Sequence, residues 1–155
     1  MALKFDIRKA FDTLDWKFLL SVLSKFGFHQ TFVNWVSVIL HSAKLSFLVN
    51  CSAMGYLSCK RGVRQGDPLS PLPFCIAEEV LSRGLIALVE KGAITPMAGC
   101  RGSSTPTHVM YADDIMIFCR GLKWSVDNIM GLFQAYGATS GQVFSPAKSS
   151  FFVGE

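Results

Sequence analysis

The chain has 155 residues, enough for one domain around one core, and 50% of them are hydrophobic while only 17% are charged. This composition excludes an intrinsically disordered protein, and the mean hydropathy of +0.36 suggests that further protein covers part of the surface. The net charge of +4 permits a nucleic-acid partner without requiring one.

The cysteines and the apolar runs exclude further classes of protein. The five cysteines form no Cys-x-x-Cys pair and their number is odd, so neither a zinc site nor a disulfide framework is expected. No apolar run approaches the roughly 18 residues that span a bilayer. Lys4 and Asp6 interrupt the first apolar run, which argues against a signal peptide. We therefore expect an intracellular, reducing location without membrane contact.

The first third of the chain alternates between strand and helix patterns. Apolar and polar residues alternate over 2–7, which predicts a half-buried strand that ends at or near Asp6. Asp12 is the expected cap of a helix whose apolar positions lie within 16–23. Helical spacing of apolar residues over 32–39 predicts a second helix.

The middle of the chain predicts a hairpin, a loop and a long helix. Residues 44–49 and 55–60 read as paired strands, with 50–54 as their connecting loop. Two glycines, two arginines and a proline over 61–69 predict a loop. The helix that follows is expected over 71–88, because its prolines fit only a first helical turn.

The last third centres on two adjacent carboxylates. Residues 92–106 are rich in Gly, Ser, Thr and Pro and predict an exposed connection. Two apolar runs flank Ala-Asp-Asp within 109–118, which predicts a hairpin with both carboxylates at its tip. A helix that ends near Gly137 and a closing strand over 149–153 follow. The whole pattern indicates one α+β domain, an α/β sandwich, over 1–155.

Three carboxylates form the candidate site. Asp113 and Asp114 lie at the expected hairpin tip, and Asp6 lies at the end of the first expected strand. Charges this close repel unless a cation neutralises them, and Mg²⁺ takes oxygen ligands. If the first strand lies beside the hairpin, the three carboxylates converge and can hold two divalent cations for phosphoryl transfer. For the Asp-Asp pair alone, a solvated turn is the alternative.

Four segments, in order, carry a resemblance to a known family. Residues 5–12, Phe-Asp-Ile-Arg-Lys-Ala-Phe-Asp, resemble the first palm motif of reverse transcriptases from non-LTR (LINE-type) retrotransposons, in the style of plant elements. Residues 64–71, 111–114 and 140–149 resemble the second, third and fourth motifs. The resemblance covers essentially the whole chain. It implies a polymerase palm, with a small, mainly antiparallel sheet packed on helices.

The resemblance implies a catalytic and metal-binding role for the carboxylates. Asp6, Asp113 and Asp114 match the family's metal-binding residues, and the carbonyl of Ile7 matches an additional ligand. The implied cofactor is a pair of Mg²⁺ ions, with Mn²⁺ as a substitute.

The resemblance also implies a nucleotide-binding set. Phe11 matches the aromatic beneath the incoming sugar, with an ordinary core aromatic as the alternative. Gln65 and Gly66 match the loop that shapes the nucleotide pocket, although Gln-Gly-Asp-Pro alone is only a turn. Lys148 matches the lysine near the leaving pyrophosphate, where a cation favours developing negative charge; otherwise it is a solvated loop lysine. Ser145 stands where the family usually has Asn.

Three further side chains are weighed on their own chemistry. Arg61 and Arg64 are candidates for phosphate contacts by charge, with plain surface arginines as the alternative. His108, beside the hairpin, is interpreted as structural.

The implied function is RNA-directed DNA polymerisation, with an RNA template, a DNA primer and deoxynucleoside triphosphates as partners. The fingers, the thumb and the endonuclease of the longer polyprotein are missing from this chain, so we expect the isolated chain to be inactive. The alternatives are an inert palm remnant of a truncated element and a non-catalytic nucleic-acid-binding module, which the weak charge disfavours. Action in the nucleus is expected by analogy with the family.

Overall fold

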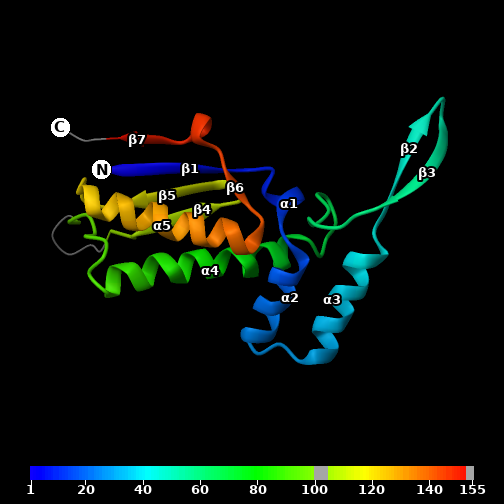
Figure 1. The fold of residues 1–155 in the computed structure, drawn as a ribbon, viewed down its shortest axis with the longest axis horizontal. Helices are drawn as coiled ribbons and strands as arrows, with labels where there is room; N and C mark the ends of the chain where they lie inside the picture. The colour runs from blue at the N-terminus through cyan, green and yellow to red at the C-terminus, as the bar shows by residue number, and fades with distance from the viewer. Residues whose placement is uncertain (100–104, 153–155) are drawn as a thin grey trace.

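Strand β1 (Ala2–Arg8) is the centre of an antiparallel sheet. In the computed structural model, which describes residues 1–99 and 105–152, β1 pairs along one edge with β5 (Asp114–Phe118), and β5 pairs with β4 (His108–Tyr111) (Figure 1). Along its other edge, β1 pairs with β6 (Val143–Phe144) and β7 (Ser150–Phe152). All of these pairings are antiparallel, so the mainly antiparallel sheet of the prediction is confirmed.

Two long helices cover one face of this sheet. Helices α4 (Pro71–Glu90) and α5 (Lys123–Ser140) run beneath it (Figure 1). The ring of Phe133 in α5 lies 4.5 Å from that of Phe5 in β1, and both are buried. Each such buried side chain stabilises the fold by roughly 1.5–3 kcal/mol relative to an exposed one. The predicted α+β sandwich of sheet on helices is therefore confirmed.

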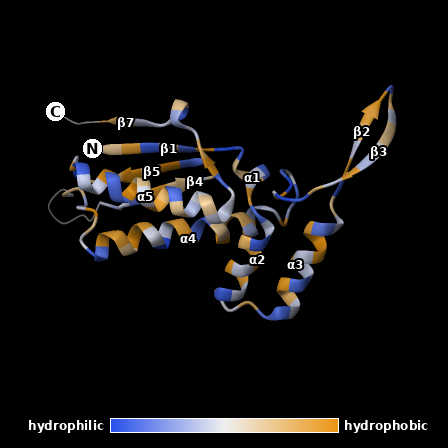
Figure 2. Cartoon of the chain, in the orientation of Figure 1, coloured by the Kyte–Doolittle hydropathy of each residue, from blue (hydrophilic) through white to orange (hydrophobic). Residues whose placement is uncertain are grey.

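The remaining elements extend beyond one end of the sheet. The short helix α1 (Ala10–Thr13) leads to α2 (Trp16–Lys25) and α3 (Gln30–Ser42), and these lead to the hairpin β2 (Lys44–Val49)–β3 (Ser52–Ser58), which protrudes from the molecule (Figure 1). Every residue of β2 and β3 is exposed, and Figure 2 shows apolar residues along this hairpin. No helix in the described part of the chain is long and apolar enough to cross a membrane.

The predicted cap of the first long helix is wrong. Asp15 caps α2, because its Oδ1 accepts a hydrogen bond of 2.9 Å from the N–H of Phe18. Asp12 lies inside α1 instead. Lys9 adopts a left-handed backbone conformation (φ 50°) and begins that short helix earlier than the sequence pattern indicates.

The predicted loop of the middle hairpin is too long. Val49 pairs directly with Ser52, so Asn50 and Cys51 alone form the turn and β3 begins well before residue 55. Both turn residues have positive φ, 48° and 63°, as a type I′ turn requires. This turn matches the twist of paired strands, which explains why the loop is short.

The predicted end of the last helix is also wrong. Helix α5 continues through Gly137 and stops at Gly141, whose φ of 75° ends it in a left-handed conformation. A Cβ at Gly137 would lie 2.8 Å from the carbonyl oxygen of Gln142, so the returning chain needs a glycine there. The closing strand is β7, and residue 153 of its predicted range lies outside the described residues. The short strand β6 was not predicted.

The predicted exposed connection over 92–106 is only partly tested, because residues 100–104 lie outside the described residues. Within its described part, Ile94 is 2% exposed and Pro96 forms an isolated bridge with Cys119. Residue 92 and residues 96–99 are exposed, as predicted, whereas Ile94 is buried and anchors this end of the connection to the core.

Candidate functional site

The pairing of β1 with β5 brings the expected carboxylates to one end of the sheet. Asp6 lies directly opposite Asp114 in the strand register, and the N–H of Ile7 donates a hydrogen bond of 2.8 Å to the carbonyl oxygen of Asp113. The predicted placement of the hairpin beside the first strand is confirmed. Because side chains alternate along a strand, Asp6 and Asp114 share the sheet face that α4 and α5 do not cover.

Two lysines neutralise this pair of carboxylates. Lys148, at the end of the 3₁₀ helix η1 (Pro146–Lys148), places its Nζ 3.5 Å from Oδ2 of Asp6. The N–H of Ser145 donates a hydrogen bond of 2.8 Å to the carbonyl oxygen of Asp6, which fixes this segment beside β1. Lys4 places its Nζ 3.0 Å from Oδ1 of Asp114. The sequence analysis did not single out Lys4, although it lies two residues before Asp6 and therefore on the same face.

The carboxylates suit a divalent cation, but the structure does not gather all three of them. Asp6 is 7% exposed, and its Oδ1 is buried without a hydrogen-bond partner. A buried acceptor without a partner destabilises the fold, and a cation that takes oxygen ligands would give Oδ1 of Asp6 a partner. Among residues 1–99 and 105–152, however, no three His, Cys, Asp or Glu side chains lie close enough together to hold a metal ion. The predicted convergence of Asp6, Asp113 and Asp114 is therefore incomplete in this structure.

Three of the four expected nucleotide-binding residues, Phe11, Gln65 and Gly66, lie around α1. Phe11 stacks on Phe74 of α4, with ring centroids 4.2 Å apart. The N–H of Val63 donates a hydrogen bond of 2.7 Å to the carbonyl oxygen of Phe11, which docks the loop after β3 against α1. Two residues further on, Gln65 and Gly66 are exposed. The structure thus brings Phe11 and the Gln-Gly loop into one neighbourhood, with Phe11 also serving as a packed aromatic.

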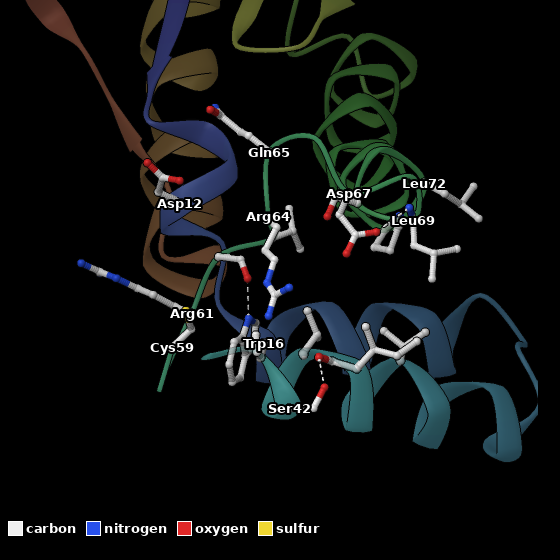
Figure 3. A pocket seen from close by; sticks show the side chains of 18 of the residues that line it. Asp12, Trp16, Ser42, Cys59, Arg61, Arg64, Gln65, Asp67, Leu69 and Leu72 are labelled. Carbon is white, nitrogen blue, oxygen red and sulfur yellow. Dashed lines mark hydrogen bonds between the residues drawn. The ribbon is translucent and has the colours of Figure 1, made fainter. Parts of the chain in front are cut away.

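A cleft of about 840 Å³ lies on the other side of this loop (Figure 3). Arg61 and Arg64 line it with apolar side chains of α3, and the indole N–H of Trp16 donates a hydrogen bond of 2.7 Å to the carbonyl oxygen of Gly62. Asp12 and Gln65 lie at its edge (Figure 3). None of the three candidate catalytic carboxylates lines this cleft, so it is a separate feature from the carboxylate site.

A buried carboxyl group close to the site was missed by the sequence analysis. Glu78 of α4 is 6% exposed, and its Oε1 has no hydrogen-bond partner. Burial raises the pKa of Glu78 to about 8, the negative charge of Asp113 adds to that shift, and a hydrogen bond from Gln142 opposes it. Spacing could have found it, because Glu78 lies four residues after Phe74 and three before Leu81, within the apolar stripe of the helix.

His108 ties the hairpin to α4. Its Nε2 lies 2.9 Å from the hydroxyl of Ser82, and its Nδ1 lies 2.9 Å from the hydroxyl of Thr107. Burial lowers the pKa of His108, and the charge of Glu79 partly offsets that effect. Both ring nitrogens are engaged with hydroxyl groups, which agrees with the structural interpretation of this residue.

Comparison with known proteins identifies the family. Residues 1–155 match the family described as "Reverse transcriptase (RNA-dependent DNA polymerase)". The chain is 29% identical to a Pol polyprotein from the type-1 retrotransposable element R2 of Popillia japonica, over 92% of this chain and 22% of that protein. It is also 29% identical to the uncharacterized 149 kDa protein of transposon TX1 from Xenopus laevis, over 96% of this chain and 11% of that protein.

A solved structure agrees on the fold. Telomerase from Candida albicans, in complex with a fragment of telomeric RNA, matches 96% of this chain and 26% of its own with a TM-score of 0.71 and 14% sequence identity. The chain spans less than a quarter of each curated relative described above. The resemblance drawn from the four motifs is confirmed over the full length of the sequence: the chain belongs to the reverse transcriptase family.

Proposed function

We propose that this chain is the catalytic palm of a retrotransposon-encoded RNA-directed DNA polymerase, which adds deoxynucleotides to the 3′ end of a primer. The observation that carries the proposal is the strand register. It sets Asp6 opposite Asp114 at the end of the hairpin, on the sheet face that α4 and α5 do not cover. A sheet face without a long helix over it leaves room for a nucleic-acid duplex beside the clustered carboxylates.

The proposed metal ligands are the carboxylates of Asp6, Asp113 and Asp114 with the carbonyl of Ile7. The orphaned, buried Oδ1 of Asp6 supports this assignment, because a cation would satisfy it. When bound, a pair of Mg²⁺ ions, or of Mn²⁺ ions, supplies stabilisation of the attacking and leaving oxygens in phosphoryl transfer.

The chain's other residues would orient the substrate. The ammonium group of Lys148, already 3.5 Å from Asp6, would lie near the leaving pyrophosphate and favour its negative charge. Phe11, held by its stacking on Phe74, would support the sugar of the incoming nucleotide from below. The exposed Gln65–Gly66 loop would shape the pocket around the base pair.

The proposed partners are an RNA template, a DNA primer, deoxynucleoside triphosphates and the remainder of a longer polyprotein, acting in the nucleus. The length of the relatives supports the last partner, since the chain spans only 22% and 11% of the two described above. We expect barely detectable synthesis from the isolated chain, because the remainder of the polyprotein would help to position the primer and the triphosphate. Misplacing a substrate by ~1 Å can cost ~10²-fold in rate.

The test is primer extension by a chimaera. This chain would replace the corresponding segment of an R2 polyprotein, and extension on a primed RNA template would be measured with Mg²⁺. We expect extension by the chimaera and its loss with Asp113→Ala. The matched control is Asp127→Ala, which removes an exposed carboxylate from α5 and should leave extension unchanged. A chimaera that folds but remains silent would favour the inert-remnant alternative.

A further inference from the structure

Four charged side chains gather on the uncovered face of the sheet. Asp6 and Asp114 face each other across the β1–β5 pair, and like charges directly opposite one another destabilise a sheet. Lys148 contacts Asp6 and Lys4 contacts Asp114, so each carboxylate has one ammonium partner. The two pairs differ in what they leave available to a metal ion.

The Lys148–Asp6 pair leaves one carboxylate oxygen free for a cation. The contact uses Oδ2 at 3.5 Å, and the buried Oδ1 remains without a partner. Oδ1 is therefore the oxygen of Asp6 that a divalent ion would take while Lys148 keeps its contact with Oδ2.

The Lys4–Asp114 pair is shorter, at 3.0 Å, and points the other way along the sheet. Lys4 is opposite Met116 in the register, so it is a diagonal neighbour of Asp114 on the side away from the hairpin tip. A long lysine side chain can reach a diagonal neighbour. The ion pair therefore draws the carboxylate of Asp114 away from the end of the hairpin where Asp113 lies.

We propose that Lys4 competes with the divalent cation for Asp114 and thereby sets the metal affinity of the site. This inference rests on the proposed function and assigns Lys4 the role of a positioning residue that acts through Asp114. The ammonium group of Lys4 contacts Oδ1 of Asp114, so a cation that binds this oxygen must displace Lys4 or share the carboxylate with it.

The test is titration of the chain itself with Mn²⁺, followed by electron paramagnetic resonance of the free ion. Lys4→Met removes the charge and keeps much of the aliphatic stem. It should tighten Mn²⁺ binding by roughly three- to tenfold, the range set by one charge several ångströms from a divalent ion. Lys4→Arg keeps the pairing charge and should bind Mn²⁺ as the unchanged chain does. Lys91→Met, an exposed lysine at the far end of α4, is the matched control and should have no effect.

A double-mutant cycle separates competition from a simple field effect. In the Asp114→Asn background, the gain from Lys4→Met should fall to about twofold or less, and salt should screen what remains. An equal gain with and without Asp114, or no gain from Lys4→Met, would overturn the role of Lys4. Unchanged Mn²⁺ binding in both Asp6→Asn and Asp113→Asn would instead overturn the metal site of the proposed function, and the inference with it. Because Lys4 and Asp114 are both partly exposed, circular dichroism should show that the Lys4 and Asp114 variants fold. The same measurement checks the fold of Asp6→Asn, which changes a buried side chain.

Discussion

The chain contains two antiparallel sheets of opposite character. The five-stranded sheet buries one face against α4 and α5, and its core residues Ile7, Ile115 and Ile117 are at most 1% exposed. The β2–β3 hairpin exposes every residue, and its apolar side chains Phe47, Leu48 and Tyr56 are 60–78% exposed. Strands pair antiparallel in both sheets, with a register shift between Leu45 and Phe47 in the hairpin, so strand pairing alone does not decide where the core forms.

The two sheets differ because long helices pack against the large sheet and not against the hairpin. In the central strands β1 and β5, buried side chains alternate with side chains on the other face, as Leu3, Lys4 and Phe5 do in β1. The hairpin carries apolar residues on both of its faces, and an exposed apolar patch of this kind marks a surface that contacts other molecules. The first sheet holds the fold and the site together, and the second contributes little to either within this chain.

The largest contrast should come from one substitution made in both sheet regions. Phe133→Ala removes a ring buried between Phe5 and Phe144 and should cost about 3–5 kcal/mol of unfolding free energy. Phe47→Ala, in the exposed hairpin, should change it by less than about 0.5 kcal/mol. Urea unfolding measures both. A cost for Phe47→Ala that approaches that of Phe133→Ala would contradict the contrast and show that the hairpin packs in solution.

The second prediction concerns the polar interior beneath the large sheet. The pKa of Glu78 in the folded chain, about 8, lies above its ordinary value of 4.5, so the folded state keeps a proton that the unfolded state releases. Its stabilising contribution is complete below pH 4.5 and is lost as the pH rises towards 8, by up to ~1.4 kcal/mol per pH unit. Glu78→Gln, which mimics the protonated acid, should flatten this slope.

The measurement for Glu78 is urea unfolding at a series of pH values. Glu90→Gln is the matched control, since it removes an exposed carboxylate from the last turn of the same helix and should leave the slope unchanged. Profiles of the unchanged chain and Glu78→Gln that run parallel from pH 5 to pH 8 would show that Glu78 is ionised throughout.

The third prediction tests the loop after β3, which connects the exposed hairpin to the part of the chain that contains the large sheet. Gly62 and Gly66 both have positive φ, 82° and 87°, but a Cβ at Gly62 would lie 2.7 Å from the carbonyl oxygen of Asp12, whereas one at Gly66 would meet open space. Gly66→Ala should cost about 1 kcal/mol through backbone strain. Gly62→Ala should cost about 1–3 kcal/mol more, because the loop must move off α1. Equal costs in thermal or urea unfolding would mean that the loop is not held against α1 at Asp12.

The parts of the fold that local rules govern could be predicted from the sequence. The alternation over 2–7 gave β1, the prolines gave the start of α4, and the apolar runs around Ala-Asp-Asp gave the β4–β5 hairpin. Strand β6 has only two residues and pairs with Ile7 and Arg8, more than 130 positions away in the sequence. No local sequence pattern therefore predicts it. The end of α5 likewise depends on the return of the chain over Gly137.

The site divides in the same way. Motifs identified Asp6 and the Asp113–Asp114 pair, but their adjacency depended on a strand pairing that the sequence could only suggest. Lys4 and Glu78 were missed because their roles depend on tertiary neighbours. Lys4 faces the carboxylate of Asp114 across the sheet, and Glu78 is buried where α4 packs against the rest of the core. Strand alternation places Lys4 on the face of Asp6, and helical spacing places Glu78 within an apolar stripe, so both signals are present in the sequence.

The smallest expected effect lies in the exposed hairpin itself. Cys51 adopts a left-handed conformation (φ 63°) that costs energy for any residue with a Cβ, and Asn-Gly is the preferred pair for a type I′ turn. Cys51→Gly should therefore stabilise the hairpin locally by about 1 kcal/mol. Hydrogen exchange should slow about fivefold for the β2–β3 amides, while the global free energy of unfolding stays within about 0.5 kcal/mol, because the large sheet does not depend on the hairpin. A matching rise in global stability would show that the two sheets unfold as one unit.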